Sequence, residues 1–187
     1  MEGLVDLVNG IIWSPALVYL CLGAGLFYSI MTRFVQVRLF GEMITLLFTG
    51  KSSAQGISSF QALAVSLAGR VGMGNIAGVA AAIGFGGPGA VFWMWIVAFL
   101  GASTAYVEST LGQIYKERDA NGQFRGGPAW YMARGLGMRW MGVLFAVFLL
   151  IASGIIFSGV QANAVARALS FSFDFPPLVT GIILAVF

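Results

Sequence analysis

Long apolar stretches, separated by short polar segments, run along the whole chain. A helix that crosses a bilayer needs about 20 predominantly apolar residues, so several such stretches in series are typical of a multi-pass membrane protein. The candidate stretches are residues 14–31, 57–85, 89–115, 139–166 and 177–187. The pattern predicts an all-α integral membrane protein, with residues 1–187 forming a single membrane domain of about five transmembrane helices.

The fifth stretch is shorter than the others. From Leu178 to Phe187 the chain has ten residues, which as a helix would be about 15 Å long, or half of a bilayer core. We therefore expect residues 177–187 to be the start of a span, and the chain to be an amino-terminal fragment of a longer protein.

The second stretch is interrupted by the sequence LAGRVGMGNIAGV, residues 67–79. The apolar residues 57–69 would form about 20 Å of helix before the interruption, and residues 75–85 about 16 Å after it. The interruption therefore falls near the middle of the bilayer. Each glycine inside a helix costs about 1 kcal/mol relative to alanine, so the glycines here predict a helix broken at its middle.

A broken helix leaves backbone groups without partners on both sides of the break. The first half ends in free carbonyls, which can replace the water around Na⁺, and the second half begins with free amides, which favour a carboxylate. Unwound backbone at this depth is tolerated only where protein or a watery cavity satisfies it. The arrangement is typical of secondary transporters, whose ion and substrate sites meet at the midplane.

Close helix packing is the alternative interpretation of these glycines. Gly74 and Gly78 have the spacing that lets two membrane helices approach closely, and packing is the better interpretation for Gly78 and Gly84. It does not account for Arg70, which costs roughly 2.5–3.5 kcal/mol at the bilayer centre on insertion scales. Arg70 therefore predicts a neighbouring partner, a cavity or snorkelling of its side chain, and Gly72 and Gly74 belong to the break.

The basic residues of the loops predict an orientation. Lys and Arg concentrate in cytoplasmic loops, and here they gather in two segments: Arg33, Arg38 and Lys51 in one, and Lys116, Arg118, Arg125, Arg134 and Arg139 in the other. We therefore expect residues 116–138 to form a cytoplasmic loop, and residues 33–51, which are too short to cross, to lie along the cytoplasmic interface. The amino terminus is then outside, with the protein in the plasma (inner) membrane.

Composition excludes several classes of function. The chain is 59% hydrophobic and 9% charged, whereas soluble domains are about 25% charged. It has no histidine and a single cysteine, Cys21, so a disulfide framework, a zinc or iron site and a nucleophile–base pair are not expected. The net charge of +3 does not suggest nucleic-acid binding. We expect a protein that is not an enzyme and has no cofactor.

Two polar residues outside the second stretch are further candidates. Gln161 lies 22 residues after Arg139, about 33 Å along a helix: a straight helix would place it at the outer interface as a bracing amide, and a tilted one would bring it toward the cavity as a substrate contact. Glu108 lies about 28 Å into the third stretch, near its cytoplasmic end. It would brace the inner half of the second span or pair with Arg70.

Three segments resemble the alanine or glycine:cation symporter family. They are GGPGAVFWMWIVAFLG (residues 86–101), SLAGRVGMGNIAGVAAAIG (66–84) and FRGGPAWYMARGLG (124–137), in the family's order and spacing. The resemblance covers nearly the whole chain and implies a fold of two inverted five-helix repeats, of which this chain would hold the first, truncated. One departure is GMGN, where many members have GTGN.

The resemblance also implies roles for the residues of the break. By position, the carbonyls of Ala68 and Val71 would bind Na⁺, and the amides of Met73 and Gly74 would hold the substrate's carboxylate. Asn75 would contribute its side-chain oxygen to an ion or hydrogen-bond to the substrate. Na⁺ is the only metal implied.

The hypothesis that follows is a secondary active symporter that couples Na⁺ influx, or H⁺ influx in some members, to uptake of alanine or glycine. Its partners would be the amino acid, Na⁺, the lipid bilayer and the missing carboxy-terminal repeat of the same transporter, with no nucleic acid. Two alternatives stay open at this point: a truncated fragment without function, and a passive channel-like membrane protein.

Overall fold

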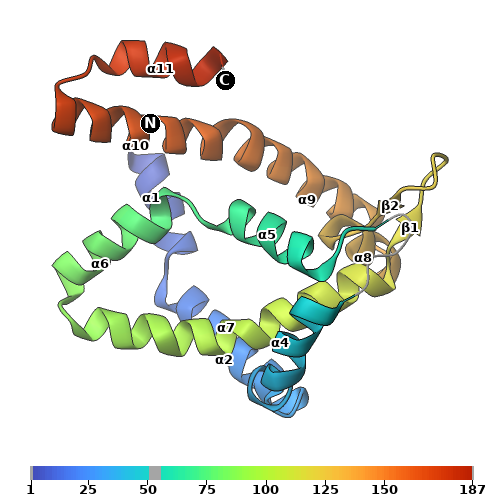
Figure 1. Ribbon diagram of the computed structural model, residues 1–187. Helices are drawn as coiled ribbons and strands as arrows, with labels where there is room; N and C mark the ends of the chain where they lie inside the picture. The colour runs from blue at the N-terminus through green and yellow to red at the C-terminus, as the bar shows by residue number, and fades with distance from the viewer. Residues whose placement is uncertain (1, 51–55, 187) are drawn as a thin grey trace. The chain divides into compact units, whose positions relative to one another are not determined.

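The computed structural model describes residues 2–50 and 56–186 (Figure 1). Two residues used above, Lys51 and Phe187, lie outside these ranges. The helices are α1 (Glu2–Ile12), α2 (Pro15–Met31), α3 (Val35–Arg38), α4 (Phe40–Thr49), α5 (Ser59–Arg70), α6 (Val79–Gly86), α7 (Gly89–Ile114), α8 (Pro128–Gly135), α9 (Arg139–Ile151), α10 (Ser158–Phe173) and α11 (Pro177–Val186). Two π-helical segments, η1 (Gly74–Gly78) and η2 (Ala152–Phe157), and a hairpin of β1 (Glu117–Arg118) and β2 (Phe124–Arg125) complete the described chain.

The chain forms two compact units. Unit 1 comprises Met1–Leu63 and Gly86–Ile114, and unit 2 comprises Ala64–Phe85 and Tyr115–Phe187. Each unit therefore contains one part of the helix that the sequence predicts to be broken, and the break itself lies within unit 2.

Three helical stretches of the described chain are long and apolar enough to cross a membrane: Val5–Met31, Gly89–Ile114 and Arg139–Phe173. A fourth span is possible if the bent pair Ser59–Arg70 and Gly74–Gly86 counts as one. The protein is thus helical and suited to a multi-pass membrane location, but the predicted five spans are not all found. α11 has ten residues, about 15 Å of helix, which is too short to cross.

The long stretch from Arg139 continues to Phe173, beyond the predicted end at residue 166. Its sequence contains no proline until Pro176, so α10 has no reason to stop at Arg167. The helix ends where Asp174 adopts a left-handed conformation with φ of 52° and two prolines follow. The stretch is 35 residues long, or about 52 Å, so it exceeds a 30 Å bilayer core and must tilt to fit one.

The predicted loop 116–138 is more structured than expected. It contains the antiparallel pair β1–β2, in which Glu117 faces Arg125 and Arg118 faces Phe124, followed by α8. The hairpin is the one exception to the all-α prediction among the described residues. In the other predicted cytoplasmic segment, residues 33–51, the backbone forms α3 and α4.

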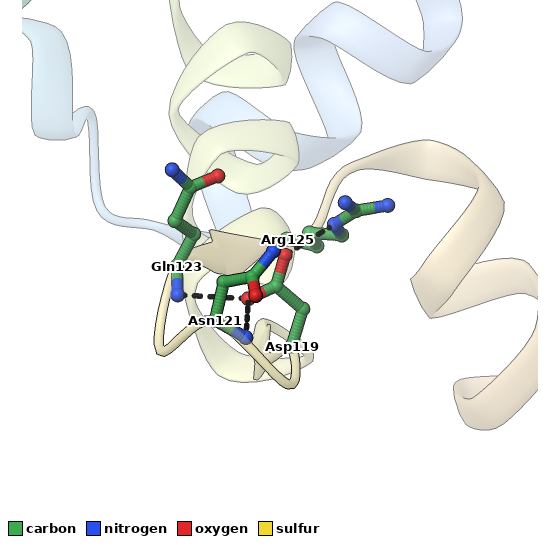
Figure 2. A network of polar contacts seen from close by, with 4 residues as sticks. All are labelled: Asp119, Asn121, Gln123 and Arg125. Atoms are coloured by element: carbon green, nitrogen blue, oxygen red, sulfur yellow. Dashed lines mark hydrogen bonds and ion pairs between the residues drawn. The ribbon is translucent and has the colours of Figure 1, made fainter.

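The turn of the hairpin is organised by one carboxylate (Figure 2). Asp119 Oδ1 accepts hydrogen bonds from the backbone amides of Asn121 and Gln123, both at 2.9 Å, and Oδ2 pairs with Arg125 Nε at 3.0 Å. The Gln123 amide is the largest cause that lowers the pKa of the Asp119 carboxyl, and the Asn121 amide and Arg125 lower it further. The ionised form of Asp119 therefore stabilises the hairpin.

The core of unit 1 is polar where α2 crosses α7. Ser29 and Ser103 are fully buried, and Ser29 Oγ donates to Ser103 Oγ at 3.0 Å. Gln36 Nε2, on α3, donates to Ser29 Oγ at 3.0 Å. Gly25 permits this approach, because a Cβ there would lie 3.0 Å from Leu100 Cβ and 3.2 Å from the Leu100 carbonyl carbon. Small and hydroxyl side chains thus join the two helices, as is common between membrane helices.

The distribution of polar and apolar residues is inverted relative to a soluble protein. Among the described residues, the buried apolar side chains are Val35 and Ala166, whereas Ser29, Ser103 and Thr180 are buried and polar. Large apolar side chains along every long helix are exposed. A soluble protein would not leave so much apolar surface in water, so these faces suit lipid or further protein.

The crossing of α2 and α7 can be tested at Gly25. Replacing Gly25 with Leu forces a side chain into the Leu100 backbone, and we expect a loss of stability of about 1–3 kcal/mol, measured as thermal unfolding of the purified full-length protein in detergent. Gly23→Leu is the matched control, because no described residue lies within 4 Å of a Cβ at Gly23. Equal losses in the two variants would show that the close approach at Gly25 does not hold the helices.

The hairpin can be tested by acidification. Because the pKa of the Asp119 carboxyl is lowered in the folded chain, its stabilising effect is present above the unfolded pKa of about 3.9 and is lost as the pH falls through the lowered value. We expect the Asn121 and Gln123 amides to exchange with solvent faster, after correction for intrinsic rates, over that pH range. In Asp119→Asn the protection of these amides should not change with pH in this way; if it does, another group controls the turn.

Candidate functional site

The candidate site is the break in the second apolar stretch. α5 ends at Arg70, where the Val71 amide makes the last backbone bond, to the Leu67 carbonyl at 2.9 Å. Helical geometry begins again at Met73, and the halves on either side are bent by 67°. The backbone therefore bends where the glycines predict an interruption.

Asn75 organises the far side of the break. Its Oδ1 accepts a hydrogen bond from the Gly72 amide at 3.0 Å, and its own backbone amide donates to the Gly72 carbonyl at 3.1 Å. A side chain that reaches back three residues to a backbone amide is half of a capping box. Asn75 thus caps the new helix and gives the Gly72 amide a partner.

Gln161 supplies the second cap from a distant part of the chain. Its Oε1 accepts a hydrogen bond from the Met73 amide at 2.8 Å, across 88 residues of sequence. Gly72 makes room for this contact, because a Cβ at Gly72 would collide with the carboxamide of Gln161. The broken stretch and α10 are therefore joined by one backbone-to-side-chain bond, and a side chain at position 72 would force the carboxamide of Gln161 to shift.

These two caps change the hydrogen bonding of the carbonyls that precede the break. In an unbroken α-helix, the amides of Gly72 and Asn75 would bond to the carbonyls of Ala68 and Val71, four residues earlier. In the structure they bond instead to Asn75 Oδ1 and the Gly72 carbonyl. The carbonyls of Ala68 and Val71 are thereby released from their usual donors, which is what a role as cation ligands requires.

Both helices at the site contain a π-helical segment. η1 follows the break directly, and η2 interrupts the stretch between α9 and α10 just before Gln161. Within η2 and the residue after it, Ser158 Oγ donates to the Ser153 carbonyl, five residues earlier, at 3.3 Å. π segments inside α-helices occur frequently at functional sites, because they free carbonyls and redirect side chains.

An open pocket of about 480 Å³ lies at the break, within unit 2. Its lining residues are Ala68, Gly69, Arg70, Val71, Gly72, Gly74, Asn75, Ser153, Phe157, Ser158 and Gln161. The structure thus brings most of the sequence-predicted site residues to one pocket, and Met73 joins them through its bond to Gln161. Glu108 lies on α7, in unit 1, and its predicted bracing role and pairing with Arg70 stay predictions.

Sequence reasoning missed the contribution of η2. Ser153, Phe157 and Ser158 line the pocket, and none of them was a candidate. The available signal was the pair of Ser-Gly steps in SGIIFSG, residues 153–159, which place two hydroxyls five residues apart in an otherwise apolar helix. That spacing matches a π turn and not an α turn, so the two hydroxyls can take part in the same local turn.

Arg70 lines the pocket but has an exposed side chain. Within the part of unit 2 that the structure describes, no carboxylate pairs with it; the ion pairs there are Arg125–Asp119 and Arg134–Glu117. Of the compensations expected for Arg70, the structure therefore shows the cavity, because Arg70 lines the pocket at the break.

Comparison of the sequence with known proteins identifies a family of transporters. The profile described as the sodium:alanine symporter family matches residues 1–187. An uncharacterised transporter of Escherichia coli (strain K12), YaaJ, is 65% identical and is matched over 100% of this chain and 40% of its own length. A putative sodium/proton-dependent alanine carrier protein of Bacillus subtilis (strain 168), YrbD, is 56% identical over 97% of this chain and 37% of its own length.

A third relative has a different substrate in its name. GlnT of Bacillus subtilis (strain 168), a probable sodium/glutamine symporter, is 49% identical over 100% of this chain and 40% of its own length. The chain therefore spans about 40% of the length of the curated relatives it matches.

The cap at Asn75 can be tested by hydrogen exchange. Asn75→Ala removes the acceptor of the Gly72 amide, and we expect that amide to exchange about two- to tenfold faster, as the loss of one hydrogen bond implies. Asn75→Asp keeps an oxygen in the same place and should retain the protection. If both substitutions leave the exchange unchanged, the Gly72 amide has another partner and the cap is not made by Asn75.

Proposed function

Because the chain belongs to the sodium:alanine symporter family, we propose that it forms the amino-terminal part of a secondary active transporter that couples Na⁺ influx to uptake of alanine or glycine. The family consists of symporters, so the protein is a membrane transporter and not an enzyme. The full transporter would complete the site with a second, inverted repeat beyond these residues. Its place would be the plasma membrane, with the amino terminus outside.

The observation that carries the proposal is the release of the Ala68 and Val71 carbonyls at the break. Na⁺ prefers oxygen ligands, and carbonyl oxygens without helix donors are the backbone groups that can offer them. We assign Ala68, Val71 and the side-chain oxygen of Asn75 to the sodium site. Asn75 Oδ1 already accepts the Gly72 amide, and its second lone pair is the one that would face the ion.

The substrate's carboxylate is assigned to the other side of the same break. The amides of Met73 and Gly74 begin the helical segment that follows, where backbone donors and the helix dipole favour an anion. Gln161 Oε1 accepts a hydrogen bond from the Met73 amide. Its carboxamide therefore lies next to the position proposed for the substrate's carboxylate. The description of the family and the name of YrbD favour alanine as the substrate, whereas the name of GlnT gives glutamine for that relative.

The proposal can be tested by transport into liposomes that contain the complete protein. An inward Na⁺ gradient should drive labelled alanine or glycine above its external concentration, and collapse of the gradient should abolish the accumulation. Accumulation driven by a pH gradient alone would assign the coupling to H⁺. Uptake that only equilibrates, with or without any ion gradient, would be the result for a passive channel and would contradict symport.

The same assay defines the substrate. Unlabelled glycine, D-alanine, L-alanine and glutamine are added as competitors of labelled alanine. Strong competition by glutamine and none by glycine would contradict the assignment of a small substrate to this pocket.

A further inference from the structure

The Met73 amide has one proton and two candidate acceptors. In the structure it donates to Gln161 Oε1 at 2.8 Å, and in the proposed function the same amide holds the substrate's carboxylate. We propose that the Gln161 carboxamide and the substrate's carboxylate compete for this donor, so that substrate binding exchanges one oxygen for the other. The inference rests on the proposed function. It adds the step in which the substrate's carboxylate displaces Gln161 Oε1 from the Met73 amide.

The direction of the exchange follows from charge. A hydrogen bond from a backbone amide to an ionised carboxylate is shorter and roughly twice as strong as one to a neutral carboxamide. Gln161 therefore holds the donor strongly enough to satisfy it in a non-aqueous setting, and weakly enough to give it up to a carboxylate. Glutamate at position 161 would be a permanent occupant, whereas an aliphatic residue would leave the amide without a partner.

Gly72 sets the position of the competing side chain. A Cβ at Gly72 would overlap the carboxamide of Gln161, whereas a Cβ at Gly159, on α10, would meet no described atom within 4 Å beyond its chain neighbours and its own helix backbone. Gly72 thus acts as a positioning residue, because the absence of its side chain lets Gln161 approach the Met73 amide. A methyl group there would push the carboxamide away without altering its chemistry.

The exchange would also link substrate binding to the contact between two helices. The bond between Met73 and Gln161 joins the broken stretch to α10, one turn beyond the π segment η2. When a carboxylate takes the donor, that bond is lost and Gln161 is free to turn away from the Met73 amide. Substrate binding would therefore remove the hydrogen bond that joins the broken stretch to α10 within unit 2.

The test compares alanine binding to the complete protein, in saturating Na⁺, for the wild type, Gln161→Leu, Gly72→Ala and Gly159→Ala. If Gln161 competes, its removal or displacement should tighten alanine binding about two- to tenfold, the range set by the net worth of one hydrogen bond. Gly159→Ala, the matched control on α10 and outside the pocket lining, should bind like the wild type. Gly72→Ala keeps the test decisive if Gln161→Leu does not fold.

Hydrogen exchange supplies the second readout. Without alanine, the Met73 amide should exchange faster in Gln161→Leu and Gly72→Ala than in the wild type; with saturating alanine, it should be protected in all four proteins. Weaker or unchanged alanine binding in both variants, or unchanged exchange without alanine, would overturn the proposal. If the wild type does not bind alanine, the proposed function is refuted. If the wild type binds alanine and the variants do not bind it more tightly, the competition alone is refuted.

Discussion

A backbone amide in the interior of a membrane must have a partner, since no water is available to replace one. The break in the second apolar stretch is the place where this requirement is hardest to meet. Two amides there lose their helix acceptors, and the side-chain oxygens of Asn75 and Gln161 replace them. The lack of a side chain at Gly72 and the contact with Gln161 on α10 both help to satisfy the Met73 donor.

The same requirement applies to the polar side chains where α2 crosses α7 in unit 1. Ser29, Ser103 and Gln36 are hydrogen-bonded to one another there, and the two serines are fully buried. Lipid offers no hydrophobic drive for helices to associate, so short polar contacts and close approach at Gly25 hold this pair together.

The sequence was informative where one local property decides the structure. Glycine spacing around Arg70 indicates the bend, and hydropathy indicates the long helices. Contacts between distant residues were less accessible: nothing in Met73 or Gln161 alone shows that they pair, because the pairing depends on where α10 passes the break. The hydropathy pattern predicts a fourth span over residues 139–166, whereas the helix continues to Phe173 and ends at Asp174, just before Pro176 and Pro177. The sequence predicts a loop where the hairpin at Asp119 forms, because the two strands have only two residues each.

The caps at the break connect the two kinds of ligand that a symporter needs. When Asn75 takes the Gly72 amide and the Gly72 carbonyl takes the Asn75 amide, the carbonyls of Ala68 and Val71 lose their donors and become available to a cation. In the proposed function, Gln161 holds the Met73 amide until an anion takes it. One local rearrangement of hydrogen bonds would then prepare a cation site and an anion site a few residues apart. A cation on those carbonyls would in turn favour a carboxylate nearby, which is a physical basis for coupling the two.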